Sequence, residues 1–550
     1  MLKNRALILL GKALWRSFDR LTENPRQAQE DFLLRLIRRN RATAFGRDHV
    51  FDKIRSVDDY FHQVPLADYE RHRPYVEMIK NGNLSALTSA APFMFTVTSG
   101  TTGEPKLIPV TKASLRINAR RTKIWYYRAL LDHPRFLRGK LLGVVSPAVE
   151  GHTPGGLPYG SASGQTYQTS PWWVKRAYAV PYEVSEIENY DAKYYVVMRL
   201  AIEQDVSFLA TPNPSTIMKL TETADVFKDA IVRDIRDGSI SNRFEVSPEI
   251  RDKLSARVAP NAARAHELER LIHARGALRP HDYWPGLQLI GCWKGGTVGG
   301  QLKKFDRWFR PETPVRDLGY LASEAHISLP IADAASEGIL AVDANFYEFV
   351  PENEMSAANP RTLMCHELQE GAAYYIILTT SAGLYRYDIN DVVKVTGFYR
   401  KTPVIEFLRK GRDVTSLTGE KVHVNQIVKA LEEAQRLSGI EVRHYRAVAD
   451  DERTGYGFMV EIEGSFPNEA ALALFLDQLD NQLSILNVEY AQKRNSKRLS
   501  RPYLCVMQPG WFNRKYRSNI QAAVRDSQFK ASLLGYQRED EAEILFKLER

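Results

Sequence analysis

Short apolar runs with the character of strands alternate with helical patterns through most of this sequence. The pattern at 113–131 has the spacing of a helix, and the strand-like runs are 93–97, 140–146, 208–211, 287–292, 338–342 and 374–379. Strands that alternate with helices are typical of α/β domains. We therefore predict an α/β fold in which a large N-terminal domain contains mixed β-sheets and helices.

The character of the sequence changes near Lys410, where a second and smaller region begins. Its expected elements are helices at 425–437, 469–488 and 514–525 and strands at 442–449, 457–462 and 503–507. A chain of 550 residues is also too long for one hydrophobic core, since cores stop growing at roughly 250–300 residues. We therefore predict two domains, 1–408 and 409–550, the second being a smaller, mobile α+β domain.

Charge and cysteine content narrow the classes of function. The net charge of +9 is dilute over 550 residues, and no zinc-finger, RNA-recognition or basic-zipper pattern is present, so we expect no nucleic-acid partner. The three cysteines, Cys292, Cys365 and Cys505, are far apart and odd in number. This argues against a disulfide framework and is typical of a reducing compartment. We therefore expect a cytoplasmic protein, while its oligomeric state stays open.

Hydropathy gives no indication of a membrane partner. No run approaches the roughly 18 apolar residues that would cross a bilayer. The N-terminal residues form an amphipathic helical pattern with Leu2, Leu9, Leu10 and Leu14 on one face. A face of this kind usually packs against the body of a protein. We therefore expect these leucines to be buried.

A loop rich in hydroxyl groups and glycine follows the first strand-like run. It reads Thr98-Ser99-Gly100-Thr101-Thr102-Gly103-Glu104-Pro105-Lys106. Its glycines permit backbone conformations that aim several N–H groups into one concavity, and the hydroxyls and Lys106 add donors and a positive charge. It is not a Walker A loop, because Lys106 lies three residues after Gly103. The simple alternative is a polar turn after a strand. We predict that the loop binds phosphate.

Four segments, in the expected order, resemble signatures of the adenylate-forming superfamily, which includes acyl-CoA synthetases and luciferases. They are the loop at 98–106, Tyr320-Leu321-Ala322-Ser323-Glu324, Tyr385-Arg386-Tyr387-Asp388-Ile389-Asn390-Asp391, and Arg409-Lys410-Gly411-Arg412-Asp413. The last of these resembles the hinge that opens the C-terminal domain.

The resemblance implies roles for individual residues. Tyr320 would lie beside the adenine, Glu324 would help hold magnesium, and Asp391 would bind the ribose hydroxyls. ATP and Mg²⁺ are the implied cofactors. The implied ATP site comprises Ser99, Gly100, Thr101, Thr102, Lys106, Tyr320, Ser323, Glu324, Asp391 and Arg409.

A closer resemblance is to the acyl-acid amido synthetases, best known as plant auxin-responsive enzymes that conjugate indole-acetic or jasmonic acid to amino acids. It is carried by 383–387, 391–398, 347–351 and 527–530. The resemblance implies a ligase that forms an acyl-adenylate and passes the acyl group to an amino acid or other amine. It also implies that Lys530 reaches back into the active site. Lys106, Glu324 and Lys530 are the implied catalytic residues.

Two segments bear on the substrate and on departures from the family. The segment Ile290-Gly291-Cys292-Trp293 occupies the place of an acyl-pocket strand in the plant enzymes, and a glycine-rich stretch follows it. Cys292, Trp293 and Gly295 are therefore expected to line an acyl pocket. Their different side chains put the plant substrates in doubt. Asn390 stands where the family usually has Gly, and this change is expected to affect the turn that presents Asp391.

Elementary chemistry agrees with these assignments. Attack of a carboxylate on the α-phosphate brings two anions together, so catalysis depends on positioning and on neutralising charge. Glu324 suits magnesium, which takes oxygen ligands from one or two carboxylates and from phosphates. Two alternatives stay open: an acyl-CoA ligase or other adenylate-forming enzyme with a thiol acceptor, and a non-catalytic nucleotide-binding protein of the same fold.

Overall fold

The structure is a computed structural model of the 550-residue chain. It describes residues 2–98, 106–355, 357, 360–411, 414–415, 417, 420, 422–450, 452–495, 499–515, 533–536 and 538–549. The chain divides into two compact units, unit 1 (Met1–Phe407) and unit 2 (Leu408–Arg550). This division falls one residue before the boundary in our domain prediction.

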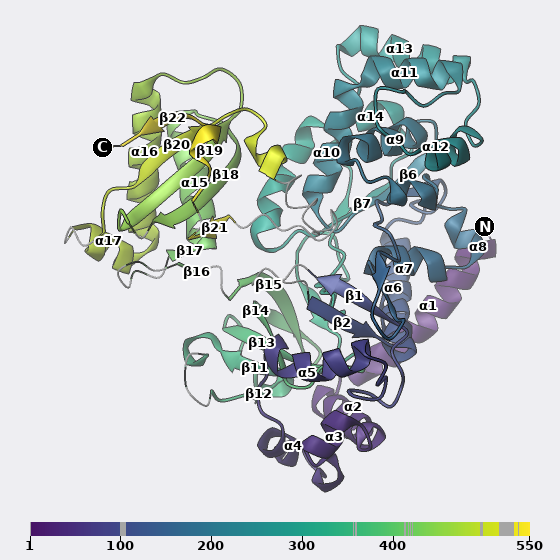
Figure 1. The fold of residues 1–550 in the computed structure, drawn as a ribbon, viewed down its shortest axis with the longest axis vertical. Helices are drawn as coiled ribbons and strands as arrows, with labels where there is room; N and C mark the ends of the chain where they lie inside the picture. The colour runs from purple at the N-terminus through teal and green to yellow at the C-terminus, as the bar shows by residue number, and fades with distance from the viewer. Residues whose placement is uncertain are drawn as a thin grey trace. The chain divides into compact units, whose positions relative to one another are not determined.

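Helices make up the N-terminal part of unit 1 (Figure 1). They are α1 (Leu2–Leu21), α2 (Pro25–Asn40), α3 (Ala44–Asp48), η1 (Phe51–Lys53), α4 (Val57–Gln63) and α5 (Tyr69–Lys80). Side chains at their starts fix several of these boundaries: Asn24, Thr43, Ser56 and Asp68 each accept a hydrogen bond from an N–H group of the following first turn. Such caps satisfy N–H groups that have no partner within the helix.

The face of α1 that packs differs from our expectation. Leu9 and Leu10 are 69% and 47% exposed, whereas Leu7, Ile8, Leu14 and Trp15 pack against the core. The reason lies at Gly11, where a Cβ atom would stand 2.3 Å from Cβ of Tyr127. Tyr127 belongs to α6 (Lys112–Asp132), and this close approach requires a glycine and turns Leu9 and Leu10 toward solvent. The predicted burial of these two leucines was wrong.

Three sheets form the rest of the framework of unit 1. The first has the order β2-β1-β5-β4, the second β3-β6-β7-β8, and the third β12-β11-β13-β14-β15-β10-β9. The first contains β1 (Met94–Thr98), β2 (Lys106–Val110), β4 (Gly151–His152) and β5 (Pro158–Gly160), with β1 antiparallel to β2 and parallel to β5. It is thus a mixed sheet.

The second sheet is parallel and lies among helices (Figure 1). Its strands are β3 (Lys140–Leu142), β6 (Val206–Ala210), β7 (Leu289–Gly291) and β8 (Val315–Arg316). Val206 to Leu209 are all buried, as expected of a parallel strand that is covered on both faces of its sheet. The connecting helices are α7 (Ala162–Thr169), α8 (Trp172–Lys175), η2 (Tyr182–Glu186), α9 (Tyr190–Ala201), α10 (Pro214–Val226), α11 (Lys228–Asp237), α12 (Pro248–Ser255), α13 (Ala262–Arg275), α14 (Pro280–Tyr283) and η3 (Gly296–Arg307).

The third sheet is antiparallel in its described pairs and packs against the N-terminal helices in one core. Its longest strand is β14 (Tyr387–Tyr399), which our sequence analysis did not identify as a strand. The other elements are β9 (Ser328–Leu329), β10 (Gly338–Leu340), β11 (Phe346–Pro351), η4 (Glu352–Glu354), β12 (Leu363–Met364), η5 (Cys365–Glu367), β13 (Ala373–Thr379) and β15 (Thr402–Lys410).

Unit 2 has a core of its own between one sheet and two helices. The sheet has the order β21-β18-β19-β20-β22. The elements are β16 (Val414–Thr415), β17 (Val422–His423), α15 (Val424–Ser438), β18 (Val442–Asp450), β19 (Gly455–Ile462), α16 (Glu469–Leu486), α17 (Val488–Asn495), β20 (Tyr503–Met507), β21 (Leu534–Gly535), η7 (Glu541–Glu543) and β22 (Ile544–Leu548). Most of the predicted helix at 514–525 lies outside the described residues.

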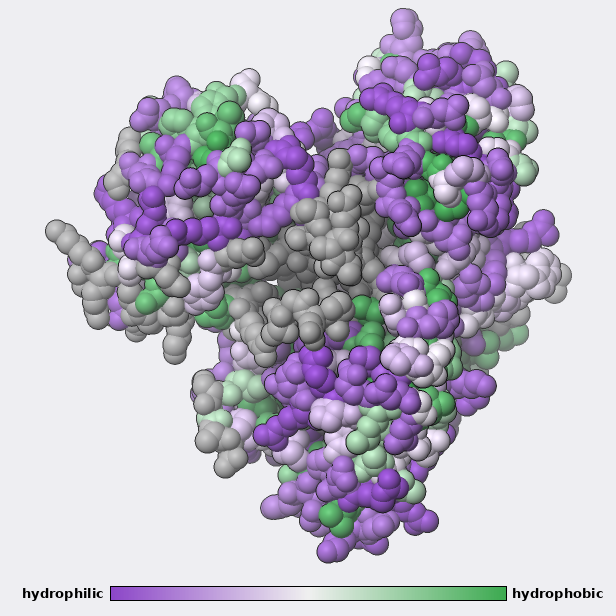
Figure 2. All heavy atoms as spheres, in the orientation of Figure 1, coloured by the Kyte–Doolittle hydropathy of each residue, from purple (hydrophilic) through white to green (hydrophobic). Residues whose placement is uncertain are grey.

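The predicted fold class is confirmed: a large α/β part, with several sheets among its helices, precedes a smaller α+β part. Among the described helices, none combines the length and the apolar character needed to cross a bilayer. Figure 2 shows that hydrophilic residues predominate on the visible face of unit 1, with hydrophobic residues in small patches.

Candidate active site

A bulge in β14 presents Asp391. Tyr375 of β13 pairs with Val392, but Ile377, two residues further on, pairs with Asp388, so β14 contains two more residues than its partner here. Asn390 lies within this stretch with a φ of 57°, and its N–H donates to Oδ1 of Asp388 at 2.6 Å. Asn is one of the few residues that tolerates this left-handed conformation. Asn390 therefore adopts a conformation that glycine also allows, which limits the effect expected from the departure at this position.

Asp391 faces the tyrosine that the sequence analysis placed beside adenine. The Tyr320 hydroxyl donates a hydrogen bond to Oδ2 of Asp391, whose side chain is buried. Burial and the carboxylate of Asp391 hold the pKa of Tyr320 well above its usual value, so this hydroxyl stays a donor. The ring of Phe407 packs 5.4 Å from that of Tyr320, centroid to centroid. The structure therefore brings two predicted nucleotide-binding residues into direct contact.

A tight hairpin carries Ser323 and Glu324. The Ala322 N–H donates to the Ala325 carbonyl at 2.9 Å, and the Ile327 N–H donates to the Tyr320 carbonyl at 2.9 Å. Ser323 and Glu324 are consequently at the tip, and both are partly exposed. A carboxylate at such a tip is accessible to a cation that also contacts phosphate groups.

Lys106 begins β2, directly opposite Thr98 at the end of β1. Its ammonium lies 5.6 Å from the centroid of the Tyr69 ring. The Tyr69 hydroxyl accepts a hydrogen bond from the Leu107 N–H at 2.9 Å, which ties α5 to β2. Residues 99–105 connect the two strands, so Ser99, Gly100, Thr101 and Thr102 lie outside the described residues.

A short segment, 64–69, joins β2 to β14, and the sequence analysis missed it. The Ala67 N–H donates to the Arg386 carbonyl at 2.9 Å, and the Asp388 N–H donates to the Ala67 carbonyl at 2.8 Å. Two residues later, Tyr69 contacts β2. This segment therefore holds the strand that starts with Lys106 close to the strand that presents Asp391.

Tyr387, the first residue of β14, is close to charged groups from several of these elements. Burial raises the pKa of its hydroxyl, and the charges of Glu324, Tyr69, Asp388 and Asp391 raise it further. Two of these groups are predicted site residues on separate motifs. Tyr387 was part of a recognised motif but received no role in the sequence analysis, because nothing local indicated its position between Glu324 and Asp391.

The predicted acyl-pocket residues follow β7. The Cys292 side chain is fully buried in the core around the parallel sheet, where burial raises the pKa of its thiol. Trp293 is partly exposed, and its N–H donates to the Pro212 carbonyl at 2.8 Å. Gly295 is also partly exposed, and a Cβ added there would lie 3.2 Å from Cβ of Ser336. The role of these three residues in an acyl pocket stays a prediction. The Cys292 side chain is enclosed in the core, whereas Trp293 and Gly295 are partly exposed.

Asp317 connects the segment that contains Trp293 and Gly295 to the hairpin that begins at Tyr320. Its Oδ2 accepts the Lys294 N–H and its Oδ1 accepts the Gly319 N–H, both at 2.6 Å. Its own carbonyl accepts the indole N–H of Trp125 at 2.8 Å. Burial raises the pKa of Asp317 to about 6, against the effect of these N–H donors. Because one carboxylate binds the residue after Trp293 and the residue before Tyr320, it fixes their separation.

We predict that Asp317→Asn lowers kcat/KM for adenylation by about tenfold, since a hydrogen bond to a charged group is worth roughly 1.5–3 kcal/mol. The amide of Asn offers one acceptor oxygen for two N–H donors. With Asp317, kcat/KM should also fall as the pH drops through about 6, because protonation removes the carboxylate. The measurement is the pH profile of kcat/KM, with Glu312→Gln, an exposed change nearby, as the control. An unchanged acidic limb in Asp317→Asn would contradict this prediction.

Several predicted site residues lie at the edge of the described residues or outside them. Only the backbone of Arg409 is described, at the end of β15, and Arg412, Asp413 and Lys530 lie outside the described residues. In the described part of the chain, no three His, Cys, Asp or Glu side chains gather into a metal site. Magnesium is usually held by one or two carboxylates together with phosphates and water. The partly exposed carboxylate of Glu324 fits that mode, and Lys106, Tyr320 and Asp391 fit a nucleotide.

Comparison with known proteins shows to which sequences this chain is similar. Residues 14–315 match the GH3 family N-terminal domain, 338–410 the GH3 family central domain, and 425–539 the GH3 family C-terminal domain. The chain is 25% identical to indole-3-acetic acid-amido synthetase GH3.2 of Arabidopsis thaliana, over 78% of this chain and 83% of that protein. It is 24% identical to the jasmonoyl–L-amino acid synthetase JAR6 of Nicotiana attenuata, over 76% and 75%.

A solved structure shares the fold over nearly the whole length. The GH3.15 acyl acid amido synthetase superposes with a TM-score of 0.83 at 20% identity, over 96% of this chain and 95% of that one. The family matches cover most of the chain. Lys106 lies in the match to the N-terminal domain, and Asp391 lies in the match to the central domain. The predicted resemblance is confirmed: this chain belongs to the GH3 family.

Proposed function

We propose that this protein is an ATP-dependent acyl-acid amido synthetase. It activates a carboxylic acid as an acyl-adenylate with release of pyrophosphate, then transfers the acyl group to an amino acid or other amine with release of AMP. The observation that carries this proposal is the contact between Tyr320 and Asp391. It unites two separate adenylation motifs, and the Glu324 hairpin is continuous with Tyr320. Membership of the GH3 family and the names of the relatives support the same activity.

In this proposal each described residue acts on a different part of the substrates. Asp391 accepts hydrogen bonds from the ribose diol, and Tyr320 packs beside the adenine while its hydroxyl orients Asp391. Lys106 neutralises phosphate charge, so that the carboxylate oxygen of the acid can approach the α-phosphorus and form the P–O bond as the bond to pyrophosphate breaks. Glu324 would help hold a magnesium ion, which would supply further neutralisation of phosphate charge.

The second step needs an amine at the acyl carbon. The amine nitrogen attacks the carbonyl of the adenylate, the bond to AMP breaks, and the nitrogen loses a proton to give the amide. We propose that residues 409–413 form a hinge between these steps and that Lys530 then meets phosphate or carboxylate oxygens. Remodelling between two reactions at one site is a common use of domain motion.

The test is carboxylate-dependent ATP–pyrophosphate exchange with a panel of aromatic, aliphatic and hydroxy acids. Acids that support exchange are then incubated with mixed amino acids, or with coenzyme A, and the products are identified by mass. Amides formed without coenzyme A support the proposal. Thioesters formed instead would favour an acyl-CoA ligase, and nucleotide binding without exchange would favour a non-catalytic protein.

We predict that Glu324 and Asp391 act on different parts of ATP. Glu324→Gln should raise the magnesium concentration needed for half-maximal exchange, because a neutral amide is a poorer ligand for a hard cation. Asp391→Asn should weaken nucleotide binding with a smaller effect on magnesium, because its partner is the Tyr320 hydroxyl and the site is buried. Magnesium titrations of both variants measure this. The same magnesium dependence in both variants and in the parent would show that the division of roles is wrong.

A further inference from the structure

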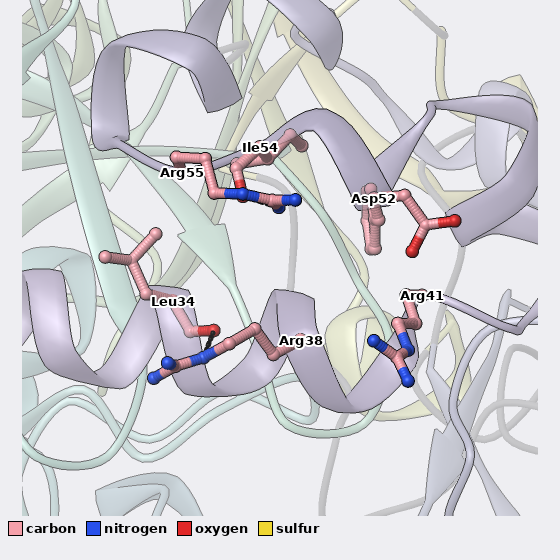
Figure 3. Close-up of a pocket in the computed structure, with 7 residues that line it drawn as sticks. Leu34, Arg38, Arg41, Asp52, Ile54 and Arg55 are labelled. Carbon is pink, nitrogen blue, oxygen red and sulfur yellow. Dashed lines mark hydrogen bonds between the residues drawn. The ribbon is translucent and has the colours of Figure 1, made fainter.

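A cavity of about 360 Å³ opens in unit 1 between α2 and the segment that contains η1 (Figure 3). Its lining residues are Leu34, Arg38, Arg41, Phe51, Asp52, Ile54 and Arg55. The lining has an apolar part, in which Phe51 and Ile54 are buried, and a charged rim. None of the predicted adenylation residues lines it, so it is a separate feature of the fold.

Three arginines approach this cavity from two segments. Figure 3 shows Arg38 on α2 and Arg55 on the opposite side, with Arg41 just after the end of α2. Arg38 Nε donates to the Leu34 carbonyl and an Arg55 NH group donates to the Ile54 carbonyl, both at 3.1 Å, so each guanidinium keeps further donors. Within the described residues, no carboxylate forms an ion pair with any of the three.

The wider segment is strongly basic. Residues 35–55 contain seven Lys or Arg and two Asp, which accounts for more than half of the net charge of +9. The surrounding surface at α2 to α4 is largely hydrophilic (Figures 1 and 2). Like charges around one cavity repel each other unless an anion lies among them. A single carboxylate in the lining, Asp52, leaves an excess of positive charge.

We propose that this cavity binds a small phosphorylated molecule, with the arginines contacting the phosphate and Leu34, Phe51 and Ile54 contacting its apolar part. The guanidinium group presents a planar fork of donors that fits phosphate oxygens. A doubly charged phosphate also neutralises more of the arginine charge than a carboxylate does. The volume is at the small end of the range for ligand pockets, about 300–1,000 Å³, which suits one small molecule.

The test is calorimetric titration of the full chain with phenyl phosphate and, separately, with inorganic phosphate. The pocket variant is Arg38→Gln/Arg55→Gln. The matched control is Arg35→Gln/Arg39→Gln, which removes two positive charges as the pocket variant does, both from positions on α2 that do not line the cavity. We expect the pocket variant to raise the Kd at least about tenfold, as losing charged hydrogen bonds does, while the control changes it little. Any binding at the adenylation site is common to all three proteins.

The titrations distinguish a phosphate ester from free inorganic phosphate as the ligand. Tighter binding of phenyl phosphate than of inorganic phosphate, lost in the pocket variant, supports a phosphate ester. Equal binding of both, again lost in the pocket variant, supports free phosphate at the same arginines. Equal affinities in wild type and pocket variant, or an equal loss in the control, would overturn the proposal. Melting temperatures should be unchanged, since the substituted arginines are exposed, and pyrophosphate exchange reports the proposed function separately.

Discussion

Replacing Lys106 by alanine is expected to lower the rate of carboxylate-dependent ATP–pyrophosphate exchange by about 10²–10³-fold, the usual effect of removing a preorganised group that stabilises developing charge. Lys106 is fixed at the start of β2 by the pairing of β1 with β2 and by the contact of Tyr69 with Leu107. Its ammonium is therefore positioned before the substrates bind. Ser99→Ala should have a loss of similar order if the loop at 99–105 contacts the phosphates.

A matched lysine gives the control for this experiment. Lys112→Ala removes the same charge six residues further on, at the exposed first turn of α6, and should leave exchange unchanged. Initial rates of exchange at saturating acid and ATP provide the measurement. Exchange at the wild-type rate in both Lys106→Ala and Ser99→Ala would exclude the phosphate-loop assignment, whatever the effect of Lys112→Ala.

Replacing Glu348 by alanine is expected to lower the free energy of unfolding by about 3–5 kcal/mol, the cost of leaving a buried charge without its partner. Glu348 is 1% exposed, and its Oε1 accepts hydrogen bonds from Nε of Arg386 at 3.0 Å and from a terminal guanidinium nitrogen at 2.6 Å. Arg386 also donates to the carbonyls of Phe61 and Val64 at 2.9 and 2.8 Å. Burial raises the pKa of Glu348, and Arg386 opposes that rise.

Chemical denaturation of wild type and variants measures this effect. Glu249→Gln, which removes an exposed partner of Lys253, should change the free energy of unfolding by less than about 1 kcal/mol. The double variant Glu348→Met/Arg386→Met should lose less free energy of unfolding than the sum of the losses in Glu348→Met and Arg386→Met. Removing both charges leaves neither one unpaired. A strictly additive loss would show that the ion pair does not account for the effect.

Local pattern was enough to predict many elements. The strand at 503–507 coincides with β20, and α6 and α15 lie within about a residue of the predicted helices. β20 is buried along its whole length and α15 has a clear amphipathic face, while a capping box of Thr111 and Ser114 fixes the start of α6. The family motifs identified Tyr320 and Asp391, which the structure brings into contact. Glu348 and Arg386, which also carried the family resemblance, form an ion pair in the core.

Other features depend on contacts that no local pattern contains. β14 was missed because the bulge at Asn390 interrupts its alternation with polar residues. The segment at 64–69 reads as a loop, and its pairing with Arg386 and Asp388 is decided by residues more than 300 positions away. The buried face of α1 depends on the approach of Tyr127 to Gly11. In each case a distant partner determines the outcome.

The pairing of Ala67 with β14 has a consequence for synthesis of the chain. Asn40 likewise donates a hydrogen bond to the Tyr385 hydroxyl, 345 residues further on. At about 5–20 residues per second, the ribosome adds β14 roughly 15–60 s after the N-terminal helices. During that interval, apolar side chains that later pack against β14 and the residues just before it are exposed to solvent. Phe45 and Phe51, which contact the Tyr385 ring in the folded protein, are examples. We therefore expect the nascent chain to be a client of ribosome-associated chaperones until Asp391 has emerged.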